Sequence, residues 1–260
     1  MLRENVLKRK LQQGETVFGL ICSVPHPTMV EMIAAADYDF VIIDTEHVLI
    51  NPETLENMLR AADASGITAL VRVQDAAPNT ILRVLDAGAH GVVVPHVRTK
   101  EEAEAIVKAS RYYPQGMRSL NGGRPADFAK IDLQGYLTYA NEQVMVVPMI
   151  ENREGVDNAA DIASVPGVDM ILEGAADLSQ SYGLPWQTRS ETVQSALAQA
   201  AAAVRAQGVP YCAIPRALED VALWQERGVT AFVLGEERGT AFRALRTHLS
   251  TYRDAGTGRR

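Results

Sequence analysis

Short apolar runs rich in β-branched residues alternate along the chain with longer amphipathic segments, a pattern typical of βα units around a parallel sheet. Eight such runs occur, at residues 16–24, 40–47, 68–74, 91–97, 144–151, 169–175, 210–216 and 230–237. Strands buried on both faces read as near-continuous apolar runs, so this pattern favours a closed barrel of parallel strands over an open sheet.

The segments between the runs carry the start and stop signals of helices. After the second run, Asn51 is a suitable N-cap, Pro52 suits the first helical position and Gly66 ends the helix. An additional amphipathic segment at residues 3–14 precedes the first strand, and we expect it to close the barrel floor. The sequence therefore predicts an α/β fold, a (β/α)8 TIM barrel with an extra N-terminal helix.

The eight units form one domain with one irregular connection. We expect a single barrel domain over residues 1–253 and a flexible tail at 254–260. Residues 115–136 contain four glycines and no clean period, and this segment is far longer than a usual connection. Because it carries Arg118 and Arg124 in an otherwise acidic protein, we expect it to be a functional loop.

Composition narrows the possible partners. The net charge is −7, and the 25 basic residues are scattered rather than gathered in a stripe, which argues against a nucleic-acid partner. No apolar run approaches the roughly 18 residues that a membrane span needs, so we expect a cytoplasmic protein. Cys22 and Cys212 lie in apolar runs without metal-like spacing, and we expect buried free thiols.

Titratable residues gather where the predicted strands end. The ends of the second, third, fifth and sixth runs, with the residues that follow them, carry Asp44, Glu46, His47, Arg72, Glu151 and Asp177. Active sites of this architecture lie at the C-terminal face, where strand ends and the loops after them meet. We therefore expect these side chains to face a substrate, while the apolar part of each run fills the barrel.

Glu151 and Asp177 form a candidate metal site, because they lie about one βα unit apart and come from adjacent strands. Two carboxylates with room for waters suit a hard divalent cation, most readily Mg²⁺ or Mn²⁺, although Co²⁺ and Zn²⁺ also fit. The alternative is that each carboxylate only caps the helix that follows it, and spacing alone does not decide between the two.

The arginine and the histidines each allow two interpretations. Arg72 is either a buried ion-pair partner or the cation that binds an acidic substrate. His47 is either a core histidine or a base that Asp44 orients, and the nearby carboxylate favours the base. His96 lacks a partner close in sequence and is interpreted as structural. The remaining histidines are interpreted as surface residues of loops or helices: His26, His90 and His248.

Two absences narrow the chemistry. No lysine stands at a strand end, so a Schiff-base mechanism lacks its nucleophile. The loops after the seventh and eighth runs are not rich in glycine, and Glu236 and Glu237 would repel a phosphate there. We therefore expect a metal to activate the substrate carbonyl, and we do not expect a phosphosugar substrate.

Four segments, IIDTEH, LVRV, PMIEN and GAADLS, resemble in order and spacing the signature segments of the HpcH/HpaI family, the metal-dependent class II pyruvate aldolases. The resemblance runs from about residue 5 to 250. It implies that Glu151 and Asp177 hold Mg²⁺ or a similar ion, on which a 2-oxo acid chelates through its carboxylate and ketone oxygens. It also implies that Arg72 stabilises the developing enolate or alkoxide oxygen and that His47 serves with a water in proton transfer. The substrate carboxylate would be held by the backbone amides of Gly174, Ala175 and Ala176.

Three departures from the family pattern favour one branch. The family usually has Gln-Ile-Glu at 149–151 and Gly-Pro-Ala-Asp or Gly-Pro-Asn-Asp at 174–177, and its long loop has more small residues and aromatics. This sequence is more similar to the branch that makes citrate from oxaloacetate and acetyl-CoA for siderophore assembly. Oxaloacetate has a second carboxylate that needs a cation, which Arg118 or Arg124 would supply; alternatively, these arginines would meet the phosphates of coenzyme A.

Other functions stay open. An aldolase that cleaves 4-hydroxy-2-oxo acids and releases pyruvate would use the same site, and a thioester lyase of the citrate lyase type is related in fold. A non-catalytic barrel that senses 2-oxo acids belongs to a different class, although a sensor does not need an oriented base. The family resemblance also implies a hexamer whose last helix, residues 239–253, is exchanged between subunits.

Overall fold

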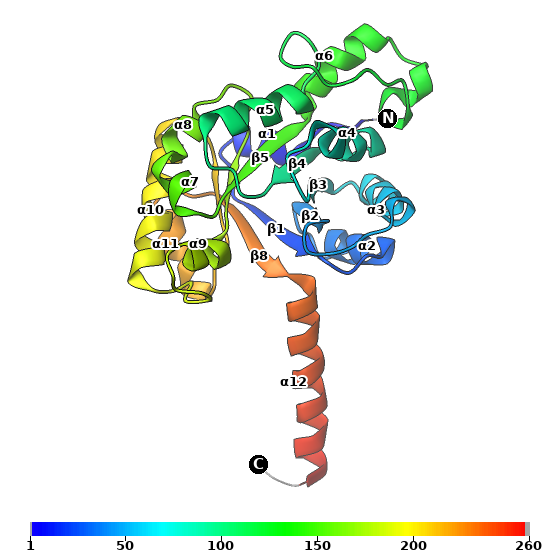
Figure 1. Cartoon of the computed structure of the whole chain (residues 1–260). Coiled ribbons are helices and arrows are strands. Elements are labelled where there is room, and N and C mark those ends of the chain that lie inside the picture. Colours follow the sequence, from blue (N-terminus) through cyan, green and yellow to red (C-terminus); the bar gives the residue numbers. More distant parts are fainter. Residues whose placement is uncertain (1, 258–260) are drawn as a thin grey trace.

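The computed structural model describes residues 2–257 and shows a closed barrel of eight parallel strands surrounded by helices (Figure 1). The strands are β1 (Val17–Cys22), β2 (Phe40–Asp44), β3 (Thr68–Arg72), β4 (Gly91–Val94), β5 (Met145–Ile150), β6 (Ile171–Glu173), β7 (Tyr211–Ala213) and β8 (Ala231–Glu236). Each strand pairs with the next along the sequence, and β8 pairs with β1. The predicted barrel is confirmed, with each predicted strand in place.

The helices follow the predicted alternation. They are α1 (Val6–Gln12), α2 (Pro27–Ala35), α3 (Pro52–Ser65), α4 (Pro78–Ala87), α5 (Lys100–Ser110), the 3-10 helix η1 (Arg124–Ala129), α6 (Leu133–Gln143), α7 (Arg153–Asp157), α8 (Ala159–Ala163), α9 (Ala175–Ser181), α10 (Glu191–Ala206), α11 (Leu218–Glu226) and α12 (Glu237–Thr257). At α3 the predicted signals are all present: the Asn51 side chain accepts from the Glu53 N–H, Pro52 is the first residue, and Gly66 adopts φ 76°. Within residues 2–257, no helix is both long enough and apolar enough to cross a membrane.

The barrel interior is a packed apolar core rather than a channel. Phe40 fills its lower part because Gly19, on the neighbouring strand, leaves room; a Cβ at Gly19 would lie 2.3 Å from the Phe40 ring. Leu7 of α1 belongs to the same buried cluster, and its N–H donates to Thr68 Oγ1 at 3.3 Å. The extra N-terminal helix is therefore confirmed, and it covers the N-terminal end of the barrel.

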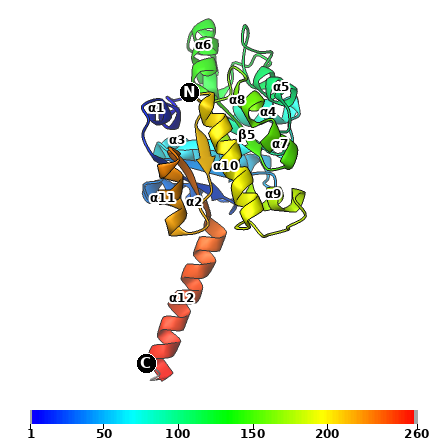
Figure 2. The same ribbon diagram turned by 90° about the vertical axis from the view of Figure 1, so that its left-hand side faces the viewer.

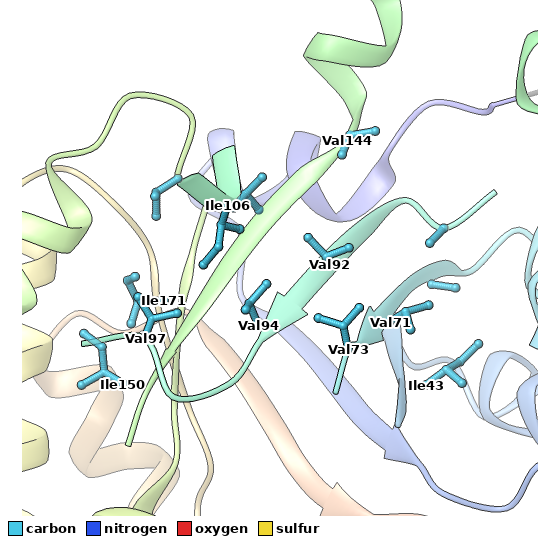
Figure 3. Close-up of a cluster of buried hydrophobic side chains, with 14 of the residues drawn as sticks. Ile43, Val71, Val73, Val92, Val94, Val97, Ile106, Val144, Ile150 and Ile171 are labelled. Carbon is cyan, nitrogen blue, oxygen red and sulfur yellow. The ribbon is translucent and has the colours of Figure 1, made fainter. Parts of the chain in front are cut away.

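A second apolar layer joins the outer face of the strands to the helices. Figure 3 shows part of it, with Ile43, Val71, Val92 and Ile171 of the strands and Ile106 of α5 among the labelled side chains of one buried cluster. Full burial of such a side chain stabilises the fold by about 1.5–3 kcal/mol. With both strand faces buried, only the strand ends are available to polar groups.

The last helix leaves the barrel. α12 extends away from the other helices in both views (Figures 1 and 2), and α6 lies at the opposite end of the molecule. The helix continues to Thr257, so residues 254–257 of the predicted tail are helical, and residues 258–260 lie outside the described part.

Candidate active site

The ends of β2 and β3 place an arginine between two carboxylates. Asp44 and Arg72 are register partners on these strands. Arg72 Nε donates to Asp44 Oδ1 at 3.0 Å and Arg72 Nη2 lies 2.8 Å from Asp44 Oδ2, while Nη1 lies 3.2 Å from Glu46 Oε2. Only 1% of Asp44 and 9% of Arg72 is exposed, so this fork is buried and fixed.

Asp44 is charged in spite of its burial. Burial by itself raises the pKa of the carboxyl, but the hydrogen bond and charge of Arg72 outweigh this effect, and the pKa is lowered overall. Asp44 Oδ1 also accepts from the backbone N–H groups of Glu46 and His47, at 3.1 and 3.4 Å. The prediction that Asp44 orients the His47 ring is therefore wrong: Asp44 holds the Arg72 guanidinium and the backbone of the loop.

Two histidines face Glu46. His47 Nε2 lies 3.7 Å from Glu46 Oε2, and 58% of the His47 side chain is exposed, which excludes the alternative of a core histidine. His96 Nε2 lies 3.4 Å from Glu46 Oε1, and His96 Nδ1 lies 3.3 Å from Glu151 Oε1. His96 therefore has partners that its local sequence does not show, because Glu46 follows β2 and Glu151 follows β5; the structural role of His96 stays a prediction.

His96 also has an unusual backbone. Its φ is 58°, in the left-handed region that a residue with a side chain rarely adopts, and its N–H donates to Glu151 Oε1 at 2.7 Å. Strained backbone of this kind persists only where surrounding contacts fix it, and it concentrates at functional sites. The sequence signal for His96 was its position after Pro95, just beyond the end of β4.

Glu151 is a buried carboxyl beside other acids. It is 2% exposed at the end of β5, and burial raises its pKa to about 7; the charges of Glu46 and Asp177 act in the same direction, while His96 opposes them. Asn152, rather than Glu151, caps α7, and its side chain accepts from the Gly155 N–H at 2.8 Å. The capping interpretation of Glu151 is therefore excluded.

The β6–α9 junction completes this side of the site. Gly174 precedes α9 and its N–H donates to the Ile150 carbonyl at 3.1 Å. A Cβ at Gly174 would lie 2.3 Å from Glu151 Oε2, so only glycine permits this approach. Ala175, Ala176 and Asp177 form the first turn of α9, with Asp177 inside the helix rather than at its cap. Asp177 and Glu151 interact electrostatically, as the prediction of a shared site requires.

The donor set suits a cation that keeps open coordination positions. Within residues 2–257, no three His, Cys, Asp or Glu side chains are close enough to form a complete metal-binding cluster. Glu151 and Asp177 supply two carboxylates, and a carboxyl whose pKa is raised by burial and, to a smaller extent, by neighbouring acids is stabilised in its charged form by a nearby cation. The residues present therefore fit a hard divalent ion whose other ligands are water and substrate.

The long loop lies at the other end of the barrel. Arg118 Nη2 contacts Asp86 Oδ1 at 2.7 Å, and Arg124 pairs with Asp63. Asp63 and Asp86 stand near the ends of α3 and α4, which lie beside the N-terminal ends of the strands. Arg118 and Arg124 therefore do not reach the active site of their own chain, and the prediction that they bind substrate there is wrong.

A further buried acid was not found from the sequence. Glu173, 1% exposed, faces the helix layer and accepts from the Ile214 N–H at 3.0 Å and from the Tyr211 hydroxyl at 3.3 Å. Burial raises its pKa to about 7. The sequence signal was an acid in the fourth position of the otherwise apolar run MILEG, directly before Gly174.

A closed (β/α)8 barrel with titratable side chains concentrated at the C-terminal ends of its strands has the arrangement typical of TIM-barrel enzymes. The family model of "HpcH/HpaI aldolase/citrate lyase" matches residues 18–243, and the chain belongs to this family. Members of this family depend on a divalent metal. The four ordered segments in the sequence had indicated the same family.

Solved structures and characterised relatives agree with this assignment. The crystal structure of citrate synthase SbnG is 49% identical, covers 98% of this chain and 100% of its own, and superposes with a TM-score of 0.91. An HpcH/HpaI aldolase from Desulfitobacterium hafniense DCB-2 is 26% identical with a TM-score of 0.91, covering 95% of this chain and 96% of its own. A 4-hydroxy-2-oxovalerate aldolase of Novosphingobium aromaticivorans is 34% identical over 95% of this chain and 96% of its own length. The protein is therefore an enzyme of the aldolase and lyase class.

Proposed function

We propose that this enzyme makes or breaks a carbon–carbon bond beside the ketone of a metal-bound 2-oxo acid, and that its reaction is citrate synthesis from oxaloacetate and acetyl-CoA. The observation that carries the proposal is the buried Arg72, held by Asp44 and Glu46 close enough to Glu151 for their charges to interact. This arrangement sets a fixed positive group beside a carboxylate suited to a metal.

Glu151 and Asp177 would hold the cation. When bound, a divalent ion anchors the carboxylate and ketone oxygens of the 2-oxo acid and polarises the ketone. The backbone around Gly174, Ala175 and Ala176 would hold the substrate carboxylate against this side of the site. Because Mg²⁺ prefers oxygen ligands and retains several waters, it is the ion that we propose, with Mn²⁺, Co²⁺ and Zn²⁺ as substitutes.

Arg72 would stabilise the negative charge that develops on the ketone oxygen. Its guanidinium is fixed by Asp44 before substrate arrives, so little reorganisation accompanies the reaction. His47, exposed above Glu46, would remove a proton from the thioester methyl group. The methyl carbon then bonds to the ketone carbon, the ketone oxygen takes up a proton, and water hydrolyses the thioester to give citrate and free thiol.

Two observations favour citrate synthesis within the family. The chain is 49% identical to citrate synthase SbnG over nearly its whole length, against 34% to the aldolase of Novosphingobium aromaticivorans. The departures adjoin the proposed metal ligands: Met149 lies on β5 shortly before Glu151, and Ala175 and Ala176 begin α9, the helix that carries Asp177. A role in siderophore assembly follows from the resemblance to that branch. The second candidate is cleavage of 4-hydroxy-2-oxo acids to pyruvate, favoured by the aldolases among the relatives.

The test is an incubation of chelator-stripped protein with oxaloacetate and acetyl-CoA, with and without Mg²⁺. We expect thiol release that depends on the metal and equals the citrate formed. If no citrate forms and the same preparation releases pyruvate from a 4-hydroxy-2-oxo acid, the aldolase reading replaces ours.

We also propose that α12 is exchanged between subunits of a hexamer. Its apolar residues recur on one helix face and are 50–69% exposed in the single chain: Phe242, Leu245, Leu249 and Tyr252. A helix that extends from the barrel with an uncovered apolar stripe is suited to a second copy. Leu245→Asp should lower the mass measured by light scattering, whereas Thr247→Asp, on the opposite helix face, should not; an unchanged mass for Leu245→Asp would contradict the exchange.

A further inference from the structure

The ring of helices opens between α3 and α4. α2 packs along α3 and α4 packs against α5, whereas α3 and α4 make few contacts with each other. A cavity of about 330 Å³ lies in this gap. This volume falls within the range of about 300–1,000 Å³ that is usual for small-molecule sites.

The cavity adjoins the active site. Thr45 and Gln74 line it, and they follow β2 and β3 at the C-terminal end of the barrel. The N–H and the hydroxyl of Thr45 both donate to the Arg72 carbonyl, at 2.9 and 2.7 Å. Because Thr45 stands between Asp44 and Glu46, a ligand that lies in the cavity and passes over Thr45 enters the mouth of the barrel.

The cavity lining has a polar and an apolar part. Asn79 and Thr80 and, one helical turn later, Arg83 form the polar part on α4, and the apolar part is formed by Ile50, Leu55, Val84 and Ala87. A ligand for this cavity therefore has both an apolar part and a hydrogen-bonding or charged part.

Arg83 is the charged group available to a ligand. It is exposed and makes no ion pair or side-chain hydrogen bond with any residue of the described range, although the protein is acidic overall. The acid that also lines the cavity, Glu56, is already paired with Arg60 at 3.1 Å. At the start of α4, Asp75 accepts a hydrogen bond from the Ala77 N–H and so occupies the helix terminus. An anionic group of a ligand would therefore pair with Arg83 rather than with the helix terminus.

We propose that this cavity binds the nucleotide part of a coenzyme A thioester, with Arg83 pairing to a phosphate and the apolar wall receiving the adenine ring. The pantetheine arm then runs over Thr45 and brings the thioester methyl to the ketone beside Arg72. This inference rests on the proposed condensation and gives the second substrate a site of its own, which the loop arginines at the opposite end do not provide.

Calorimetric titration of the Mg²⁺-loaded protein with coenzyme A tests the site directly. Arg83→Glu should weaken binding at least about tenfold, as expected for the loss of a charge-assisted hydrogen bond. Lys130→Glu, which also reverses a positive charge but lies in the exposed long loop at the opposite end of the barrel, is the matched control and should bind as the wild type does. Ala87→Phe, which fills the apolar part, should weaken binding as well.

Steady-state kinetics separates this site from the proposed reaction. In Arg83→Glu the Michaelis constant for acetyl-CoA should rise about tenfold while that for oxaloacetate is retained. If the wild-type protein binds coenzyme A but forms no citrate, the proposed reaction is contradicted and the proposed binding site is not. Citrate formation with unaltered coenzyme A binding in both Arg83→Glu and Ala87→Phe would overturn the site and leave the reaction in place.

Discussion

The two ends of the barrel use charge differently. At the N-terminal end, each buried arginine of the described residues is paired with an acid: Arg111 contacts Asp169 at 2.7 Å, an acid that Lys8 also contacts, and Arg118 contacts Asp86 at 2.7 Å. At the C-terminal end, one arginine, Arg72, is shared by Asp44 and Glu46, and the buried Glu151 has no arginine or lysine within ion-pair distance among the described residues. Balanced pairs stabilise the fold, whereas an excess of buried acid marks the place where a cation and a substrate complete the structure.

The largest contrast should come from making one chemical change at both ends. Arg72→Lys removes the planar fork that Asp44 fixes, and kcat should fall by about 10²–10³, as when a preorganised donor is lost. Arg118→Lys should leave kcat unchanged and lower the melting temperature, because Arg118 is buried, pairs with Asp86 and lies 4.6 Å from the centre of the Tyr112 ring. The measurements are steady-state kinetics and thermal unfolding of both variants. A large fall in kcat for Arg118→Lys, or none for Arg72→Lys, would contradict this division between catalysis and stability.

A smaller effect is expected from a single methyl group. Gly174→Ala places a Cβ against Glu151 and should weaken Mg²⁺ binding about 10–100-fold, the usual cost of disturbing the surroundings of a metal ligand. Gly122→Ala, in the long loop, meets nothing nearer than the Ala129 Cβ at 3.3 Å and should bind Mg²⁺ normally. Equal affinities in the two variants would mean that Gly174 does not set the position of Glu151.

The smallest effect concerns stability rather than catalysis. The pKa of Glu173 is raised to about 7 in the folded state, above its value of about 4.3 in an unfolded chain. Its contribution is therefore greatest below pH 4.3 and declines as pH rises to about 7. Glu173→Gln should show a flatter melting temperature between pH 5 and 8 than the wild type. Parallel curves for the two proteins would indicate that Glu173 is ionised throughout this range.

The sequence predicted those features that depend on one strand or on two neighbouring strands. The apolar runs determined the barrel, and the equal spacing of strand ends brought Asp44 beside Arg72 and Glu151 near Asp177. The partners of His96 were not found, because Glu46 and Glu151 follow two other strands and no local sequence pattern records that relation.

The long loop was misplaced for a topological reason. Residues 115–136 belong to the connection from helix α5 to strand β5, which also contains η1 and α6, and helix-to-strand connections lie at the N-terminal end of a (β/α)8 barrel, away from the site. Length and basic charge indicated a functional loop, but position in the βα order already excluded it from the active site of its own chain. The ion pairs of Arg118 and Arg124 confirm this placement.

The central claim is that Glu151 and Asp177 hold a divalent cation at the C-terminal end of the barrel. It is tested most directly by titrating chelator-stripped protein with Mn²⁺, comparing wild type, Glu151→Gln and, at the N-terminal end, Asp86→Asn. We predict one site per chain in the wild type and in Asp86→Asn, and no measurable site in a folded Glu151→Gln protein. Binding of Mn²⁺ to Glu151→Gln with wild-type affinity would contradict the account.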